Sequence, residues 1–281
     1  MIRSLLYVPG SASRFIEKAH LRGADAIIVD LEDAVAPNKK IAARQNLKKT
    51  VTSVGQKGTP VFVRVNNDAQ LLYEDCIAAC RAGAFGLYLP KISDVETLKN
   101  LDELLSPIEQ EMQRPPLHFV PLIEDALGVI KALEIATGPR VYAISAGSED
   151  LATSMGGLPT PEVLYLPKLL VHMAAKAAGV LSFGLLRSVA DYKQIDSYKS
   201  SIAEARDFGF DGASCIHPSI VELLNEGFVP SEEELARAHR LVAAAQAQEA
   251  LGVGAFNFEG DFIDAPITAR ARALISKYSS H

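Results

Sequence analysis

The sequence predicts an α/β protein, a closed (β/α)8 TIM barrel followed by a C-terminal helical extension. Three observations predict this class. Short apolar runs rich in β-branched residues occur eight times along the chain, segments with helical periodicity separate them, and the runs are apolar throughout instead of alternating with polar residues. Continuous apolar strands separated by helices are typical of a parallel sheet covered by helices, and eight such units suffice to close a barrel.

The expected strands and helices alternate in order along the chain. The strands are expected at Leu5–Val8, Ala26–Val29, Val61–Val65, Gly86–Leu89, Phe119–Ile123, Val141–Ile144, Val180–Phe183 and Gly212–Ile216. The helices are expected at Ser13–Arg22, Lys39–Val54, Tyr73–Ala82, Val95–Met112, Ala126–Thr137, Pro161–Ala178 and Ser200–Phe208. An open doubly wound sheet would alternate in the same way, but the turn PGSAS after the first strand lacks the glycine-rich dinucleotide fingerprint. The barrel is therefore preferred.

The predicted barrel domain covers residues 1–229, and residues 230–281 form the predicted extension. The segment PSEEEL opens a helix there, because Ser231 suits the N-cap position and Glu234 follows three residues later, as in a capping box. This helix is expected to end at about Leu251. An extended stretch and a last short helix, Thr268–Lys277, complete the chain.

Composition excludes several classes of partner. The chain has 281 residues, 48% of them hydrophobic, with a formal net charge of -6 and a pI near 5.6. This balance argues against binding to nucleic acid or to an anionic membrane, and anionic substrates would need local Arg or Lys. The apolar runs fall far short of the roughly 20 residues of a membrane helix, so neither a membrane span nor a signal peptide is expected. Three cysteines, a sparse and odd number, favour buried thiols in a reducing cytoplasm.

Polar residues follow most of the predicted strands, where a barrel of this kind places its reactive groups. They are Asp30, Glu32, Asp33, Arg64, Asn66, Lys91, Glu124, Asp125, Ser145, Ser148, Glu149, Asp150 and His217. Carboxylates that converge from several strand ends are costly unless a cation neutralises them or catalysis requires them. Because the set offers oxygen ligands without a His–Cys spacing, it predicts a hard ion such as Mg²⁺, for which two protein carboxylates suffice.

Several of these residues also have an ordinary structural interpretation. Glu124 could be a loop residue or a helix N-cap. Asp150 and Glu149 could be first-turn acids that complement a helix dipole. Arg64 closes the run VFVRV, where a cation is expected either to bind a ligand or to pair with a buried anion. His217 precedes a proline and is expected to have a structural role.

Several long motifs occur in order over nearly the whole chain. They are RSLLYVPGSASRF (Arg3–Phe15), GADAIIVDLEDAVAP (Gly23–Pro37), VRVN (Val63–Asn66), LPK (Leu89–Lys91), PLIE (Pro121–Glu124), GSEDLA (Gly147–Ala152), CIHP from Cys215 and FIDAPI from Phe262. Through these motifs the sequence resembles the citrate lyase beta-subunit-like branch of the aldolase/citrate lyase superfamily, which includes malyl-CoA and citramalyl-CoA lyases. Their number and order make the resemblance far more specific than one short motif.

The resemblance implies a (β/α)8 barrel that assembles into homo-trimers or hexamers. It implies Mg²⁺, or Mn²⁺ in its place, held by Glu124 and Asp150, with Glu124 also facing the substrate. Arg64 is implied to bind the substrate carboxylate, and Asp264 to reach a neighbouring subunit's site as a catalytic acid or base. Arg14, in the loop after the first strand, is expected to meet the phosphates of a CoA-type thioester, because this acidic protein needs local cations for such a ligand.

The sequence departs from the family pattern around this site. GSED stands where GAED is commoner, which places Ser148 at the position of an alanine, and Ala146 stands where phenylalanine is frequent. Lys168 in YLPK stands where arginine is usual, and the segment FGLLRSVADY lacks the acidic character often seen there. These differences bear on the identity of the substrate more than on the chemistry.

The resemblance predicts metal-dependent cleavage, or formation, of a carbon–carbon bond in a malyl-, citramalyl- or citryl-thioester, with an acetyl thioester and a 2-keto acid as products. A chelated cation would act as Lewis acid, Arg64 would pair with the carboxylate, and Asp264 would exchange a proton with the thioester methyl. Two alternatives are kept. One is a citrate lyase beta-type subunit that acts only on an acyl-carrier-protein thioester in a complex, and the other is a non-catalytic protein that binds a CoA thioester or keto acid.

Overall fold

The computed structural model describes residues 1–186 and 194–278, and the chain divides into two compact units, Met1–Phe228 and Val229–His281. Most of the departing segment FGLLRSVADY, residues 187–192, lies outside the described residues. The strands of the first unit are β1 Ser4–Pro9, β2 Ala26–Asp30, β3 Val61–Arg64, β4 Gly86–Leu89, β5 His118–Ile123, β6 Ala143–Ala146, β7 Leu181–Phe183 and β8 Ala213–Cys215.

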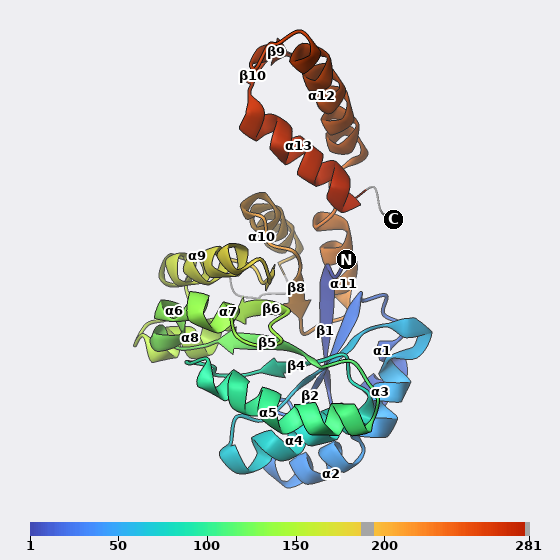
Figure 1. The fold of residues 1–281 in the computed structure, drawn as a ribbon. Coiled ribbons are helices and arrows are strands. Elements are labelled where there is room, and N and C mark those ends of the chain that lie inside the picture. The colour runs from blue at the N-terminus through green and yellow to red at the C-terminus, as the bar shows by residue number, and fades with distance from the viewer. Residues whose placement is uncertain (187–193, 279–281) are drawn as a thin grey trace. The chain divides into compact units, whose positions relative to one another are not determined.

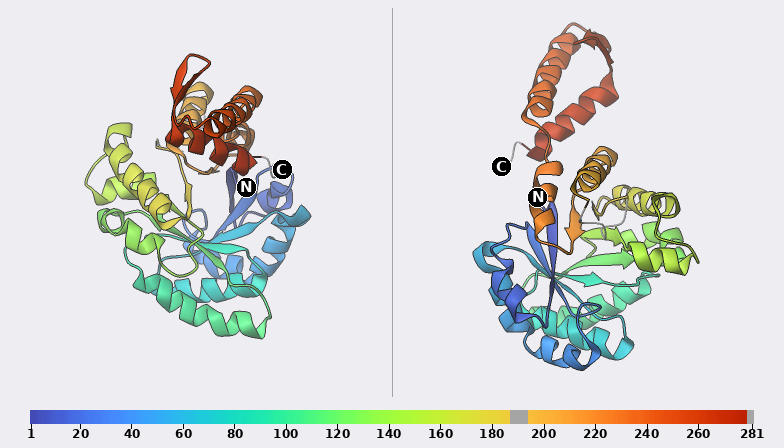
Figure 2. Two further views of the ribbon diagram at one scale, coloured as in Figure 1. Left: turned by 45° about the horizontal axis from the view of Figure 1, so that its top comes forward. Right: turned by 180° about the vertical axis from the view of Figure 1, so that it is seen from behind.

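These strands form one parallel eight-stranded sheet in the order β7-β6-β5-β4-β3-β2-β1-β8 (Figure 1). A parallel bridge between Phe183 and Gly212 brings its two edges together, so the sheet curls into a nearly closed barrel. The other views show helices around these strands (Figure 2). The predicted barrel fold is confirmed, and each predicted strand corresponds to one observed strand.

Helices cover the outside of the sheet. They are α1 Ser13–Ala19, α2 Lys40–Gln45, α3 Leu47–Val54, α4 Ala69–Ala82, α5 Glu96–Glu111, α6 Ala126–Ile130, α7 Ala132–Ala136, α8 Ser148–Ser154, α9 Pro161–Ala178, α10 Ile195–Phe208 and α11 Ser219–Gly227. The expected helix over residues 39–54 is divided at Asn46, whose side-chain amide donates to the Ala42 carbonyl and so competes with backbone pairing. The expected helix over residues 126–137 is divided at Lys131. The short helix α11 was not predicted, and α8 was anticipated only in the interpretation of Glu149 and Asp150 as first-turn acids.

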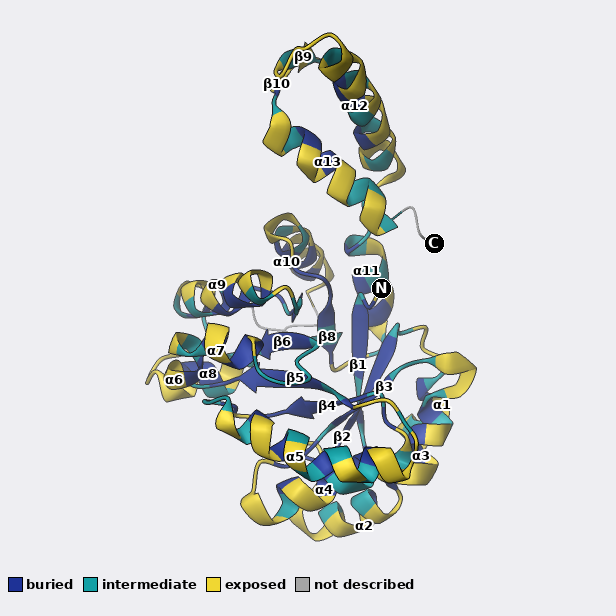
Figure 3. Cartoon of the chain, in the orientation of Figure 1, coloured by how far each residue is buried: buried dark blue, intermediate teal, exposed yellow. Residues whose placement is uncertain are grey.

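Successive strand residues face opposite sides of the sheet and form two apolar layers. The inner layer comes from strands and the residues beside them, and it consists of Ile2, Leu5, Ala26, Ile28, Phe62, Tyr88, Val120, Leu122, Ala143 and Phe183. The intervening strand residues pack against the helices in a larger cluster. Figure 3 shows the buried strands and the exposed outer faces of the helices. Because the inner positions repeat every second residue, the residues that continue them beyond the strands point into the barrel mouth.

The second unit contains α12 Glu232–Ala250, an antiparallel pair β9 Phe256–Phe258 and β10 Asp261–Ile263, and α13 Ala265–Tyr278. The predicted capping box of Ser231 and Glu234 is present at the start of α12. The stretch expected to be extended is a hairpin, and Glu259 and Gly260 between its strands both have positive φ angles. The unit has its own small core, formed by Ala238, Leu241, Ile263 and Ala271 with partly buried apolar neighbours.

Two predictions about the chain as a whole can be compared with the structure. No helix among the described residues is both long and apolar enough to cross a membrane. Cys76, Cys80 and Cys215 are all buried free thiols, as expected. Burial raises the pKa of Cys76, and it raises that of Cys215 to about 12, so both thiols stay protonated at neutral pH.

Candidate active site

Arg64 and Asp30 form an ion pair at the barrel mouth. They lie opposite each other in the register of β2 and β3, and they continue the inner positions of Ile28 and Phe62. The guanidinium donates from Nε to Asp30 Oδ1 at 2.8 Å and from Nη2 to Asp30 Oδ2 at 2.7 Å. The buried Asp30 carboxylate thus fixes one edge of Arg64 in a bidentate pair. The functional and structural-pair interpretations of Arg64 are therefore compatible.

The other edge of Arg64 faces two further carboxylates from the loop after β2. Nη1 lies 3.0 Å from Glu32 Oε2 and 3.2 Å from Asp33 Oδ2. Glu32 is buried, whereas the Asp33 side chain is 70% exposed, so Asp33 is the partner most easily exchanged. Burial raises the pKa of Glu32 to about 7; Arg64 opposes this shift, and the charge of Asp33 adds to it.

Glu124 enters the barrel mouth from the end of β5, two residues beyond the inner position of Leu122. It is 7% exposed, and its Oε2 accepts a hydrogen bond of 2.9 Å from the backbone amide of Lys91. Burial raises the pKa of Glu124 to about 7, the Lys91 amide opposes the shift, and the charge of Asp150 adds to it. A carboxylate in this setting would be stabilised by a bound cation.

Asp150 lies in the first turn of α8, and its carboxylate is 3.5 Å from Lys91 Nζ. Lys91 thus contacts both predicted ligands, with its backbone amide on Glu124 and its ammonium group on Asp150. Burial lowers the pKa of Lys91, but the neighbouring carboxylates, Asp150 foremost, raise it overall. Lys91 adopts a φ of 55°, an uncommon conformation for a non-glycine residue.

The donor set fits a magnesium ion. Within residues 1–186 and 194–278, no three His, Cys, Asp or Glu side chains are grouped so as to hold a metal by themselves. Two carboxylate ligands, with the remaining positions left to water and substrate, is the usual provision for Mg²⁺. The raised pKa of Glu124 and the proximity of Asp150 agree with a site completed by a cation.

Gly147 allows Glu124 to occupy this position. A β-carbon at residue 147 would lie 2.7 Å from Glu124 Cγ and still closer to the carboxylate oxygen. The Gly147 amide donates to the Ile123 carbonyl at 3.1 Å, which holds the two segments together. The glycine of the GSED motif is therefore required by the closeness of Glu124.

Other candidates of the sequence analysis have structural contacts. Asp125 is the N-cap of α6, and its side chain accepts a hydrogen bond from the Gly128 amide at 2.6 Å. Asn66 donates to Asp75 at 2.6 Å and accepts from Lys40, which orders the loops after β2 and β3. His217 contacts the Ser219 hydroxyl at 2.7 Å, as suits its expected structural role. Asn66 and Asp125 therefore support the site without any need to contact a ligand.

Lys168 on α9 is a buried cation that was singled out only as a departure from the family pattern. It is 4% exposed, and its Nζ donates to Ser148 Oγ at 2.8 Å and to the Leu185 carbonyl at 2.9 Å. Burial lowers the pKa of Lys168 to about 7, and the charge of Glu149 partly offsets this. The Ser148 contact ties Lys168 to the helix that carries Asp150.

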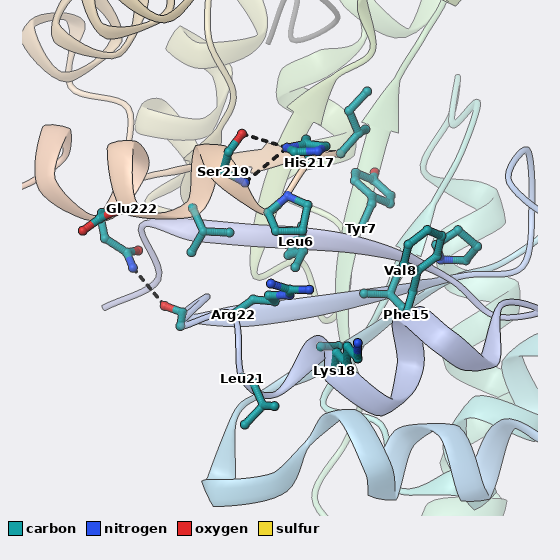
Figure 4. A pocket seen from close by; sticks show the side chains of 17 residues that line it. Leu6, Tyr7, Val8, Phe15, Lys18, Leu21, Arg22, His217, Ser219 and Glu222 are labelled. Atoms are coloured by element: carbon teal, nitrogen blue, oxygen red, sulfur yellow. Dashed lines mark hydrogen bonds between the residues drawn. The ribbon is translucent and has the colours of Figure 1, made fainter. Parts of the chain in front are cut away.

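A cavity of about 880 Å³ lies beside β1, between α1 and α11 (Figure 4). Phe15, Lys18 and Arg22 line it from the α1 side, and His217 and Glu222 line it from the α11 side. Lys18 and Arg22 thus supply cations to this cavity, whereas Arg14, the residue expected to meet the carrier's phosphates, is not among those that line it. Arg14 itself is exposed, and its guanidinium lies 4.4 Å from the centroid of the Phe15 ring.

Asp264 belongs to the second unit, where it follows β10 and precedes α13. Its carboxylate accepts from the Ile267 amide at 3.3 Å, and its backbone carbonyl accepts from the Thr268 amide and hydroxyl, both at 3.1 Å. These are the contacts of a helix cap. They leave the proposed acid–base role of Asp264 as a prediction.

Sequence reasoning did not assign roles to Asp30, Glu32, Gly147 or Lys168. For Asp30, the every-second-residue pattern of β2 was a usable signal, because residue 30 continues the inner positions 26 and 28. Gly147 was noticed as part of the GSEDLA motif and Lys168 as a departure from the family pattern, but their roles depend on contacts with Glu124 and Ser148 that the sequence does not show.

The chain is similar to several known proteins in sequence and in fold. The model of the HpcH/HpaI aldolase/citrate lyase family matches residues 3–218. Citrate lyase subunit beta of Leuconostoc mesenteroides subsp. cremoris is 31% identical over 280 residues, 97% of this chain and 92% of that protein. A (3S)-malyl-CoA thioesterase of Cereibacter sphaeroides is 34% identical over 278 residues, 98% of this chain and 94% of that protein. The structure of protein CitE from Mycobacterium tuberculosis in complex with magnesium, acetoacetate and coenzyme A has a TM-score of 0.79 and 27% identity, covering 99% of this chain and 98% of that one. The chain therefore belongs to the HpcH/HpaI aldolase/citrate lyase family.

Proposed function

We propose that this lyase cleaves, or in reverse forms, the carbon–carbon bond of a 3-hydroxyacyl thioester such as a malyl-, citramalyl- or citryl-thioester. The observation that carries the proposal is the meeting of Arg64, Glu32 and Glu124 at one barrel mouth, with Lys91 joining Glu124 to Asp150. An anion-binding guanidinium beside two carboxylates of raised pKa suits a substrate that is a carboxylate and must exchange protons.

Glu124 and Asp150 are the residues that would hold Mg²⁺, with Mn²⁺ as a substitute. The bound ion would supply Lewis-acid stabilisation to the keto oxygen and carboxylate of the 2-keto acid. The magnesium in the CitE structure and the all-oxygen donor set here support this assignment. The backbone amide of Lys91 would keep Glu124 oriented even if the Lys91 ammonium group moved away when the cation bound.

Arg64 would bind the carboxylate of the keto-acid half through its Nη1 edge. Asp30 holds Nε and Nη2, so the guanidinium keeps its plane while a ligand is exchanged at the other edge. The substrate carboxylate would displace Asp33, which is the exposed partner. Binding would then replace one weak surface contact by a charge-assisted pair in a more enclosed position.

Cleavage requires two proton movements. The 3-hydroxyl loses its proton as the carbon–carbon bond breaks, the bonding electrons pass to the thioester as an enolate, and the enolate carbon then takes up a proton to become the methyl group. Glu32, with a pKa of about 7, is suited to accept the hydroxyl proton from within the barrel. Asp264, from a neighbouring subunit, is the proposed donor to the enolate carbon.

The thioester carrier would lie in the cavity beside β1. Phe15 offers an exposed aromatic face there, and Lys18 and Arg22 offer the charges that phosphates of a CoA-type carrier need. The coenzyme A in the CitE structure supports a CoA carrier over an acyl-carrier protein. Arg14 remains a proposed contact at the rim, next to Phe15.

A homo-trimer or hexamer is proposed as the working assembly, with residues 230–281 serving the site of a neighbouring subunit. The exposed Phe262, 64% accessible, is two residues from Asp264 and suits burial against such a neighbour. A cytoplasmic location is proposed on the buried free thiols. Sedimentation of the wild-type protein and of Phe262→Ser tests the assembly, and a monomeric wild type would contradict it.

The decisive assay follows thiol release and keto-acid release separately over malyl-CoA, citramalyl-CoA and citryl-CoA, with and without Mg²⁺. The proposal expects a 2-keto acid and an acetyl thioester in equal amounts from one of them, without free thiol. Free thiol with intact hydroxy acid would instead indicate thioester hydrolysis, a second candidate favoured by the 34% identity to a malyl-CoA thioesterase. Activity on acyl-carrier-protein thioesters alone would indicate the carrier-protein alternative.

A further inference from the structure

Lys168 connects three elements behind the barrel mouth. It lies on α9 (Figure 1), and α9 packs against β6, β7 and α8. Its ammonium group donates to the Ser148 hydroxyl at 2.8 Å and to the Leu185 carbonyl at 2.9 Å. Ser148 is the first residue of α8, and Leu185 follows β7. Burying an ammonium group is costly, so a lysine that is 4% exposed needs contacts of this quality.

The helix to which Lys168 is joined is too short to hold its own position. α8 has seven residues, and its N-cap, Gly147, makes no side-chain capping hydrogen bond. Isolated helices of this length are not stable, so tertiary contacts must fix the first turn. Asp150 lies in that turn, two residues after Ser148. Any tilt of the turn therefore moves the Asp150 carboxylate relative to Glu124.

We propose that Lys168 is a positioning residue for the metal site: through Ser148 it fixes the first turn of α8, and it thereby sets the position of Asp150 relative to Glu124. The proposal rests on the proposed metal-binding role of Asp150. The hydrogen bond between Lys168 and Ser148 joins α9 to the first residue of α8. The Leu185 carbonyl holds the same ammonium group to the segment that follows β7.

The test is Mg²⁺ binding to the full-length protein, measured by calorimetry and repeated with Mn²⁺ by paramagnetic resonance. Lys168→Met keeps the length of the side chain and removes its donors. It is expected to raise the Mg²⁺ Kd about tenfold, near the lower end for loss of a residue that orients a ligand. Lys168→Arg keeps a charged donor and is expected to bind Mg²⁺ more tightly than Lys168→Met does. A wild-type Kd in Lys168→Met would overturn the proposal.

Ser148→Ala separates the positioning role from general stability. If Lys168 acts through Ser148, the alanine variant binds Mg²⁺ several-fold more weakly, and the double variant is no weaker than Lys168→Met alone. Effects that multiply in the double variant would contradict the proposal. Should Lys168→Met fail to fold, Ser148→Ala carries the test, because residue 148 is only half-buried.

Two controls separate this proposal from the proposed function. Lys176→Met removes the other lysine of α9, which pairs with Asp211 at 2.6 Å, and should leave the Mg²⁺ Kd unchanged. Asp150→Asn should abolish Mg²⁺ binding. If Asp150→Asn binds Mg²⁺ as wild type does, the metal site itself is wrongly assigned. If it loses binding while Lys168→Met and Ser148→Ala keep it, only the positioning role fails.

Discussion

The Glu124 side chain lies so close to the backbone of Gly147 that residue 147 has no room for a β-carbon. The approach joins the loop after β6 to the end of β5, through the hydrogen bond from the Gly147 amide to the Ile123 carbonyl. The position of Glu124 thus depends on the absence of a β-carbon at residue 147.

Gly147→Ala is expected to displace the Glu124 carboxylate and to weaken Mg²⁺ binding at least about tenfold, because an added methyl in a filled space forces its neighbours to move. Mg²⁺ titration calorimetry measures the effect. Gly254→Ala is the matched control, since a β-carbon there meets open space and should change nothing. Equal Mg²⁺ affinity in the two variants would show that Glu124 tolerates the shift or is not a ligand.

Glu124→Ala and Asp150→Ala are each expected to abolish Mg²⁺ binding and cleavage together, because these are the two carboxylates proposed to hold the ion. Binding is followed by calorimetry and cleavage by keto-acid release. Asp264→Ala should leave Mg²⁺ binding intact while turnover falls, which separates the proton donor from the ligands. Metal-dependent turnover that survives in both ligand variants would remove them from the site.

Stability of the metal-free protein should rise as the pH falls from about 7 to about 4.5. The pKa of Glu124 is raised from 4.5 to about 7, so the folded state binds a proton in a range where the unfolded state has lost it, and this contribution disappears above pH 7. It is on the order of 3 kcal/mol. Urea unfolding at pH 5 and pH 8, compared between wild type and Glu124→Gln, isolates it. A pH dependence that is unchanged in the variant would contradict the raised pKa.

Mg²⁺ affinity should have the opposite pH dependence, because the ion binds the ionised carboxylate and displaces its proton. Mg²⁺ affinity should therefore increase with pH up to about pH 7 and level off above it. Calorimetric Kd values at a series of pH values measure the trend. An affinity that stays constant from pH 5.5 to pH 7 would show that the ion does not compete with a proton on Glu124.

Arg64→Lys should lower kcat/KM about a hundredfold, because lysine cannot hold Asp30 in a bidentate pair and present a second edge to the substrate. Asp33→Asn should act in the opposite direction and lower KM about threefold, since it weakens the contact that the substrate must displace. Steady-state kinetics on the active thioester measure both values. An unchanged or increased KM in Asp33→Asn would place the substrate carboxylate elsewhere.

The barrel could be predicted because its strands are apolar on both faces and its helices fill the intervals, properties that local sequence carries. The divisions at Asn46 and Lys131 were missed because a short interruption hardly changes helical periodicity. The ligand candidates could be proposed since strand ends meet at one face of a barrel. The contact of Lys168 with Ser148 could not, because it joins residues 20 positions apart through tertiary packing.

The two contacts of Lys91 affect how a cation would enter and leave the proposed metal site. Its ammonium group gives Asp150 a counter-charge before any ion arrives, and its amide keeps Glu124 in place at the same time. If Glu124 and Asp150 hold a cation, the incoming ion would take the place of the Lys91 ammonium group beside Asp150. A cation that bound Asp150 would therefore have to displace one half-exposed lysine side chain, while the backbone hydrogen bond to Glu124 could stay as it is.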